Sequence, residues 1–127
     1  MPHSNTWETD GLYRKFIGEI SAYEILDSNI KLHQDSNFSH IKYVINDFSE
    51  VTGHSIEITH TRIYASTDRL ISAYKEELKI ALVVTQAELV ALANSYRDQM
   101  LGEKFECQIF KTIDEARAWI GGDKWLK

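Results

Sequence analysis

Residues 79–85, Lys-Ile-Ala-Leu-Val-Val-Thr, constrain the fold of this 127-residue chain more than any other segment, because apolar side chains stand at successive positions. Successive side chains of a β-strand point to opposite faces of the sheet, so this strand must be covered on both faces. Parallel sheets flanked by helices meet that requirement. The segment therefore predicts an interior, parallel strand in an α/β fold.

A second apolar, β-prone run covers residues 41–51 and is interrupted by Asn46-Asp47 before a small polar loop. We interpret it as the central strand. Ligands of open α/β sheets bind in the crevice at the carboxyl ends of the strands. The polar residues at the end of this run are therefore the place to look for a functional site.

Three further segments match the capping box, the sequence pattern of a helix start. Each is followed by side chains at spacings of three and four residues, which form a stripe expected to face the core. Gly102 and Gly121-Gly122 are expected to end the second and third helices. The boxes are Ser21-Ala-Tyr-Glu24, Thr85-Gln-Ala-Glu88 and Thr112-Ile-Asp-Glu115; their stripes are Tyr23, Leu26, Ile30 and His33, then Leu89, Ala93, Tyr96 and Met100, then Ile113, Ala116, Trp119 and Ile120.

The segment after the central strand admits two interpretations. Residues 52–54 are predicted to form a turn, and the Ile and Thr content of residues 56–63 favours a strand after it. A longer pattern of four- and three-residue steps favours a helix and covers roughly twice as many residues. Length decides for one helix over residues 55–76, with Ile56, His60, Ile63, Thr67, Leu70 and Tyr74 on its inner face.

The chain is expected to begin as an antiparallel hairpin, because Asp10-Gly11 stands between two β-prone runs, and Gly18 is expected to end its second strand. Residues 105–110 alternate like an edge strand, with Cys107 as a small buried hydrophobe. The element order is therefore ββαβαβαβα. It predicts a single domain, residues 1–127, with a mostly parallel mixed sheet of about four or five strands flanked by about four helices.

Composition and charge exclude several classes of function. The formal net charge is −5 without a Lys/Arg cluster, which argues against nucleic-acid binding, because phosphate neutralisation needs a basic surface. The longest apolar run, residues 80–84, is too short to cross a bilayer. The amino terminus lacks the features of a secretory signal and Cys107 is the lone cysteine, so we expect a cytoplasmic protein. No cofactor motif is present, and the spacing of His54 and His60 does not indicate a metal site.

The hydroxyl-rich turn after the central strand supplies the candidate ligand site. Its side chains, with the first N–H groups of the next helix, suit an anionic or carbonyl group. Each residue also has a purely structural interpretation: Asp47 as an Asx turn, Ser55 as a helix cap, His60 as a half-buried, hydrogen-bonded side chain. The candidate ligand-binding residues are Asp47, Ser49, His54, Ser55, His60 and Tyr64.

Two groups of apolar residues leave alternatives open. The tail Asp123-Lys-Trp-Leu-Lys127 has no helix stripe to join, so it is either mobile or docks onto its own chain or a second copy in a homodimer. A second group either packs in the core or lines a pocket for a lipid-like ligand. That group is Tyr64, Tyr74, Tyr96, Met100 and Trp119.

The element order, the stretch Asp47-Phe-Ser-Glu-Val51, the strand at residues 79–84 and the ending Phe110-Lys-Thr-Ile-Asp-Glu-Ala-Arg-Ala-Trp119 resemble the SpoIIAA-like family of small bacterial proteins in the STAS superfamily. The resemblance implies a small sheet flanked by helices. Relatives of that family are anti-sigma-factor antagonists and regulatory domains of anion transporters, and a similarity to CRAL-TRIO lipid-binding folds is also invoked. Phosphorylation by a kinase is not expected, because the Asp-Ser-Ser-Gly motif of the anti-sigma-factor antagonists is missing and Ser55 stands one place from the acceptor position.

Together these observations predict a non-enzymatic, STAS-like regulatory or binding module. It would bind a partner protein or a small apolar or anionic ligand near the carboxyl end of the central strand, without a cofactor. The alternative is a small hydrolase-type enzyme that uses Asp47 with His54 or His60. A geometric criterion separates the two, because an enzyme needs these groups within hydrogen-bond reach around an open cleft.

Overall fold

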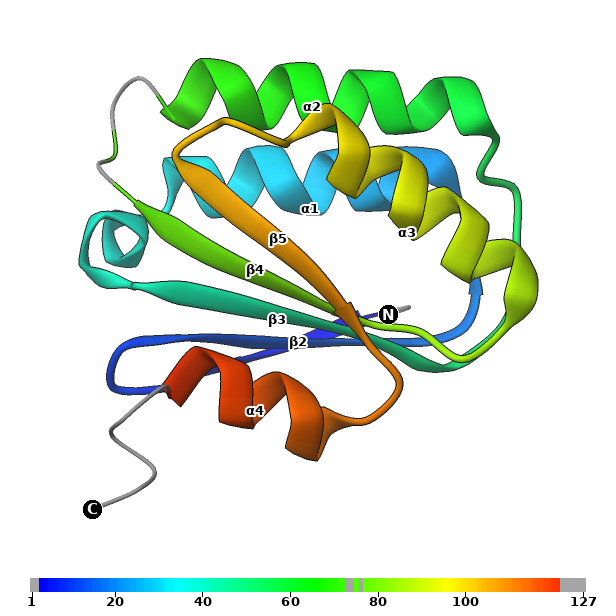
Figure 1. Ribbon diagram of the computed structural model, residues 1–127, viewed down its shortest axis with the longest axis horizontal. Coiled ribbons are helices and arrows are strands. Elements are labelled where there is room, and N and C mark those ends of the chain that lie inside the picture. Colours follow the sequence, from blue (N-terminus) through cyan, green and yellow to red (C-terminus); the bar gives the residue numbers. More distant parts are fainter. Residues whose placement is uncertain (1–2, 73–74, 76, 122–127) are drawn as a thin grey trace.

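In the computed structural model, residues 3–72, 75 and 77–121 are described, and they form one five-stranded sheet with helices on both faces (Figure 1). A short 3-10 helix, η1, precedes the central strand. The elements in chain order are β1 (His3–Trp7), β2 (Gly11–Ile20), α1 (Ala22–Gln34), η1 (Ser36–His40), β3 (Tyr43–His54), α2 (Ile58–Ser72), β4 (Leu78–Val83), α3 (Ala87–Gln99), β5 (Phe105–Phe110) and α4 (Ile113–Gly121).

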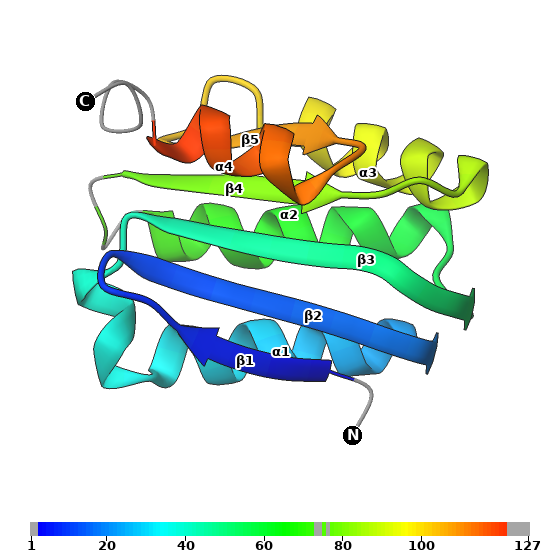
Figure 2. The same cartoon turned by 90° about the horizontal axis from the view of Figure 1, so that it is seen from below.

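The strands are ordered β1-β2-β3-β4-β5 across the sheet. β1 and β2 are antiparallel, with Trp7 opposite Leu12, and the other neighbouring pairs are parallel. Helices α1, α2 and α3 cover one face, and α4 covers the other (Figure 2). This confirms the predicted α/β class, the hairpin at Asp10-Gly11, the interior position of β4 and the edge position of β5.

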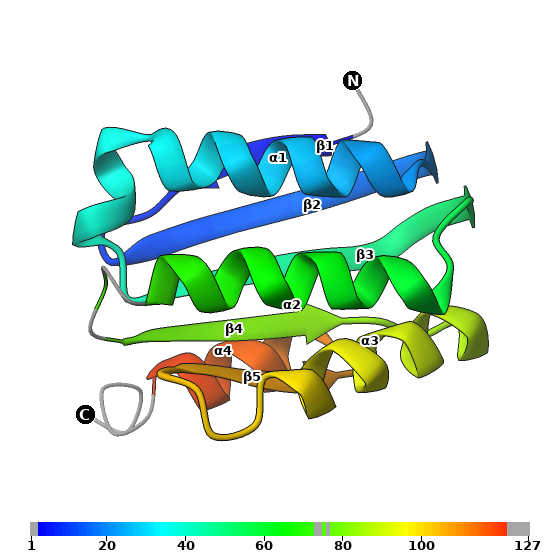
Figure 3. The ribbon, with the colours of Figure 1, turned by 90° about the horizontal axis from the view of Figure 1, so that it is seen from above.

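Strand alternation produces two hydrophobic cores. On β3, Val44 belongs to the core beneath α1, α2 and α3, and its neighbour Ile45 belongs to the core beneath α4. The predicted stripes of the last two helices are confirmed, since Leu89 and Tyr96 of α3 join the larger core and Ala116 of α4 joins the smaller one. Cys107 lies buried in the larger core, where burial raises the pKa of its thiol to about 12. Figure 3 shows α1 and α2 side by side above the sheet.

The predicted faces of α1 and α2 are wrong in part: Leu26 of the α1 stripe packs against the larger core and His33 faces its cavity, whereas other members of both stripes are exposed. On α1 the buried residues are Ile25, Ser28, Asn29 and Leu32, and Tyr23 of the predicted stripe is 72% exposed. On α2 the exposed residues include Ile63 and Leu70 of the predicted stripe. Apolar periodicity failed because both helices bury polar side chains. Those on α2 are Thr61, Asp68 and Ser72.

Of the three predicted capping boxes, the one at Ser21 forms completely and the one at Thr112 forms in part. Ser21 caps α1 reciprocally with Glu24, at 3.2 and 3.1 Å. Thr112 Oγ1 accepts from the Glu115 N–H of α4 at 3.1 Å, whereas the Glu115 carboxylate accepts from the N–H of Lys111 rather than that of Thr112. The predicted box at Thr85 is wrong. The residue before α3 is Gln86, whose side chain makes no cap bond and instead donates to the Val51 carbonyl of β3.

The predicted end of the β2 strand at Gly18 and the predicted turn at residues 52–54 are also wrong. Gly18 has φ +74°, a conformation that costs glycine little, and the β2–β3 register shifts on either side of it. The shifts let both strands continue, so that Ile20 lies opposite His54. As a result α2 begins at Ile58 rather than Ser55. The predicted glycine stop after α3 is confirmed, with Gly102 at φ +85°.

Candidate ligand-binding cavity

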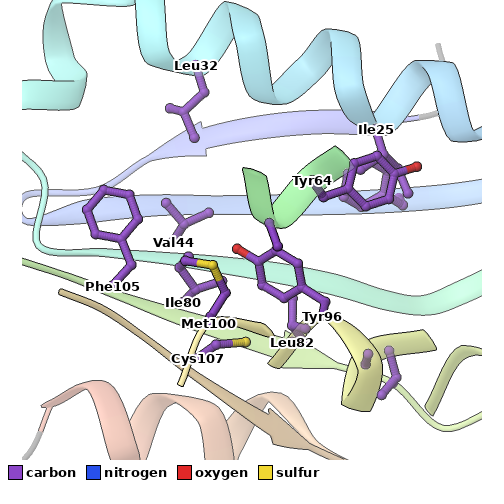
Figure 4. Close-up of a cluster of buried hydrophobic side chains, with 14 of the residues drawn as sticks. Ile25, Leu32, Val44, Tyr64, Ile80, Leu82, Tyr96, Met100, Phe105 and Cys107 are labelled. Atoms are coloured by element: carbon purple, nitrogen blue, oxygen red, sulfur yellow. The ribbon is translucent and has the colours of Figure 1, made fainter. Parts of the chain in front are cut away.

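A cavity of about 100 Å³ lies in the larger core, between the sheet and helices α1, α2 and α3. Its walls are mainly apolar, and side chains from the sheet and from helices α1, α2 and α3 gather in this region in Figure 4. Interiors of folded proteins are close-packed, so a void of this size stands out. Representative wall residues are Leu32, Val44, Tyr64, Ile80, Leu82 and Phe105.

The central strand contributes a polar residue to this apolar wall. Val44, Asn46 and Phe48 of β3 line the cavity, and the intervening Ile45 and Asp47 point to the opposite face of the sheet. On the neighbouring strand β2, Arg14 and Phe16 line the same cavity. A cation and an amide therefore sit together in the middle of a hydrophobic core.

Arg14 is 3% exposed and donates three hydrogen bonds to neutral acceptors. Its Nε donates to Asn46 Oδ1 at 2.9 Å, one terminal nitrogen donates to Ser28 Oγ at 3.1 Å, and the other donates to Asn29 Oδ1 at 2.7 Å. The Arg14 guanidinium carbon also lies 5.6 Å from the centre of the Phe16 ring. Burial lowers the pKa of Arg14 to about 10, which leaves the guanidinium charged at neutral pH.

A second buried polar group joins the three covering helices. The Asp68 carboxylate of α2 accepts the hydroxyl of Tyr96 from α3, and its other oxygen lies 3.3 Å from His33 Nε2 of α1. Burial, together with the charge of Asp68, raises the pKa of Tyr96 well above its ordinary value. These residues line the cavity together with Arg14, and the charge of Asp68 attracts the guanidinium. No hydrogen bond joins Arg14 to Asp68 within the described part of the chain.

The structure does not gather the residues that the sequence predicts as a ligand site. Asp47 is 1% exposed on the α4 side of the sheet, where its carboxylate accepts the hydroxyl of Tyr13 and, at 2.9 Å, the N–H of Ser49. The second bond is the Asx turn that the sequence left as an alternative. Ser49 is exposed, and neither residue lines the cavity.

The two histidines near the start of α2 serve local backbone contacts. His54 Nδ1 accepts from the N–H of Ile56 at 3.1 Å, and His60 Nδ1 accepts from the N–H of Glu57 at 2.8 Å. His60 thereby satisfies a backbone donor ahead of the first turn, as the acidic residue of a capping box does. Ser55 is exposed and precedes the helix without capping it.

Tyr64 is the predicted site residue that lines the cavity. Its hydroxyl donates to the Ala22 carbonyl of α1 at 2.8 Å, and burial raises its pKa to about 12. Of the residues predicted for an apolar pocket, Tyr96 lines the cavity as well. Met100 packs in the larger core, Trp119 of α4 packs against the smaller core, and Tyr74 lies outside the described residues. The predicted docking tail at residues 123–127 is also outside them.

The geometry required by the enzyme alternative is not found in the described structure. Asp47 lies on the α4 face, while His54 and His60 lie beside the start of α2, and no hydrogen bond between described residues joins the carboxylate to either imidazole. Nor do three or more His, Cys, Asp or Glu side chains of the described residues gather into a metal site. No described helix has the length and apolar character needed to cross a membrane.

Sequence analysis missed the residues that make the cavity polar at one place, namely Arg14, Asn29, Asn46 and Asp68. A signal for them exists in the sequence. Arg14 stands between Leu12 and Phe16 at the spacing of one strand face, so a buried strand places its charge inside. A charged residue at a core position is nearly always paired, which directs attention to the amides around it.

No family model and no curated protein matches the sequence. Among solved structures, one match is the unphosphorylated form of the anti-sigma factor antagonist SpoIIAA, with a TM-score of 0.60, 12% identity, and coverage of 94% of this chain and 96% of that chain. Another is an uncharacterised DUF3478-family protein with a SpoIIAA-like fold from Shewanella loihica, with a TM-score of 0.55, 14% identity, and coverage of 93% of this chain and 91% of that chain.

Proposed function

The chain has the SpoIIAA-like fold expected from its sequence, and within that fold we propose a non-enzymatic binding module whose ligand is a small molecule with an apolar body. The observation that carries the proposal is the cavity of about 100 Å³ between the sheet and helices α1, α2 and α3. Apolar pockets with a few convergent polar groups are the usual form of small-molecule sites. The proposed site therefore lies inside the core rather than at the polar loop after Asp47.

The volume limits the ligand. An engineered apolar cavity of about 150 Å³ binds benzene. A cavity of about 100 Å³ thus accepts a body of about four or five carbon atoms without movement of its walls. A long lipid chain would need α1 and α2 to separate, which would break the bond from Tyr64 to Ala22 and the contact between His33 and Asp68.

Ala93 provides a direct test, because it lines the cavity from the buried face of α3. Chemical shifts of the protein would be followed by NMR while acids, amides and alcohols with short alkyl chains are titrated at millimolar concentration. Ala93→Leu places carbon atoms where the ligand body would lie, so binding should be lost. Ala91→Leu makes the same change on the exposed face of α3 and should leave binding intact.

Two results would contradict the proposal. One is a wild-type protein whose cavity residues respond to none of these probes. The other is equal binding by the wild type and by Ala93→Leu. Should Ala93→Leu fail to fold, the smaller Ala93→Val gives the same comparison.

A second candidate function, binding of a partner protein, is favoured by the outer surface of α1 and α2, which lie side by side (Figure 3). Five large apolar side chains are exposed on these two helices: Tyr23, Ile30, Ile58, Ile63 and Leu70. Exposed apolar groups that gather in a patch mark interaction sites more often than isolated ones do. A homodimer through this surface would raise the mass measured by light scattering as the protein concentration rises, and Leu70→Asp would abolish that increase.

A further inference from the structure

We infer that the ligand is a small monocarboxylate, with its carboxylate bound to Arg14 and its alkyl body in the apolar part of the cavity. This inference rests on the proposed function, since it names the ligand class of the same site. It arises from the juxtaposition of a buried guanidinium and an apolar void of about 100 Å³.

The charge of Arg14 has no hydrogen-bonded anion among the described residues. Its bonded partners are the neutral side chains of Asn46, Ser28 and Asn29. Taking a cation out of water is costly, and buried charges are normally paired. Asp68, the carboxylate that attracts it, is already bound by Tyr96 and lies beside His33. A ligand carboxylate would supply the direct partner that Arg14 lacks.

The hydrogen-bonding groups around the cation also suit an anion. Each nitrogen of the Arg14 guanidinium donates one of the bonds described, which leaves a second N–H group on each terminal nitrogen. Two N–H groups of one guanidinium match the two oxygens of a carboxylate. The side-chain oxygens of Asn29 and Asn46 accept from Arg14, so each amide points its oxygen at the cation and still has its NH2 group as a donor.

Asp68 restricts the chemical class of the ligand further. Because its carboxylate lines the same cavity, Asp68 repels every negative charge of a ligand, and the single cation Arg14 offsets this repulsion for one charge and not for a second. This disfavours dicarboxylates and phosphates. The apolar walls and the limited volume disfavour polar acids and long chains, so a short aliphatic acid remains.

The test compares pentanoate with pentanamide, which has almost the same shape and no charge. Wild-type protein is titrated with each, and binding is measured by NMR. A hydrogen bond to a charged group is worth enough to make pentanoate bind about tenfold more tightly or better. The comparison needs no variant.

Asn46→Asp tests the role of Arg14 with a nearly isosteric change. The new carboxylate would lie where the Asn46 oxygen now accepts from Arg14 Nε at 2.9 Å, so it neutralises the cation in place. The preference for pentanoate should disappear in this variant. Asn37→Asp adds the same charge at an exposed position and should keep the preference.

The outcomes separate this inference from the proposed function. If pentanamide binds as tightly as pentanoate and Ala93→Leu abolishes both, the carboxylate class is refuted and the cavity proposal stands. If neither compound binds, the carboxylate class is refuted, and the cavity proposal is refuted as well when the short-chain alcohols also fail to bind. If the preference survives in folded Asn46→Asp, Arg14 does not select the ligand and the inference fails. Should Asn46→Asp not fold, the wild-type ratio alone decides.

Discussion

Filling the cavity should stabilise the protein, and the structure gives the size of the effect. A void costs about 24 cal/mol per Å³. The cavity of about 100 Å³ therefore costs about 2 kcal/mol when it is empty. Ala93→Leu fills part of it and loses about 0.5–1 kcal/mol of side-chain entropy. We expect a net increase of about 1 kcal/mol in the free energy of unfolding.

Ala81→Leu supplies the matched control. Ala81 is fully buried on β4 and packs with Ile45, Val83 and Ala116 in the smaller core. The same substitution there overpacks a filled core and should cost about 1–3 kcal/mol. The two variants should thus shift the urea midpoint in opposite directions, as measured by circular dichroism at 25 °C without ligand. If Ala93→Leu lowers the midpoint as much as Ala81→Leu does, the void does not accept a side chain and the reasoning is refuted.

Three other predictions concern single contacts. Arg117 donates to both oxygens of Glu8 and holds the pKa of that carboxyl below its ordinary value of 4.5. The pair's contribution to the free energy of unfolding should therefore be lost as the pH falls through the lowered pKa. When the free energy of unfolding is measured against pH, Glu8→Gln should not show this loss. Ser21→Ala should lower the free energy of unfolding by about 1 kcal/mol and Thr85→Ala by a few tenths, as checked by urea denaturation, because Ser21 caps a helix and Thr85 does not. Intact mass of the protein from its native host should show no stoichiometric phosphate on Ser55, and a species about 80 Da heavier that maps there would contradict this.

The element order and sheet topology were predictable because they depend on long, repeated signals. Residues 79–84 are apolar on both faces, and only a covered, interior strand accommodates such a run. The hairpin at Asp10-Gly11 depends on two residues with a strong turn preference. Neither signal requires knowledge of what the opposite element contributes.

The cavity was not predictable in the same way, because it depends on exceptions to apolar periodicity. The pattern on α2 placed Ile63 and Leu70 inside, yet both are exposed, and Asp68 is buried instead. Asp68 is tolerated there because Tyr96 from α3 donates to it, and Arg14 is tolerated because side chains from α1 and β3 accept from it. The apolar pattern of one helix carries no information about the polar partners that other helices and strands supply.

Gln86 contacts the β3 backbone beyond the point where β4 stops pairing with it. Beyond Asp47, β3 is paired with β2 on one side, while its pairing with β4 has ended. Exposed backbone groups along such a margin are a template on which a strand of another molecule can add, the first step towards aggregation. The Gln86 amide occupies the Val51 carbonyl in that stretch. We expect Gln86→Ala to leave the Val51 carbonyl without this donor, which would make the stretch easier for a foreign strand to pair with.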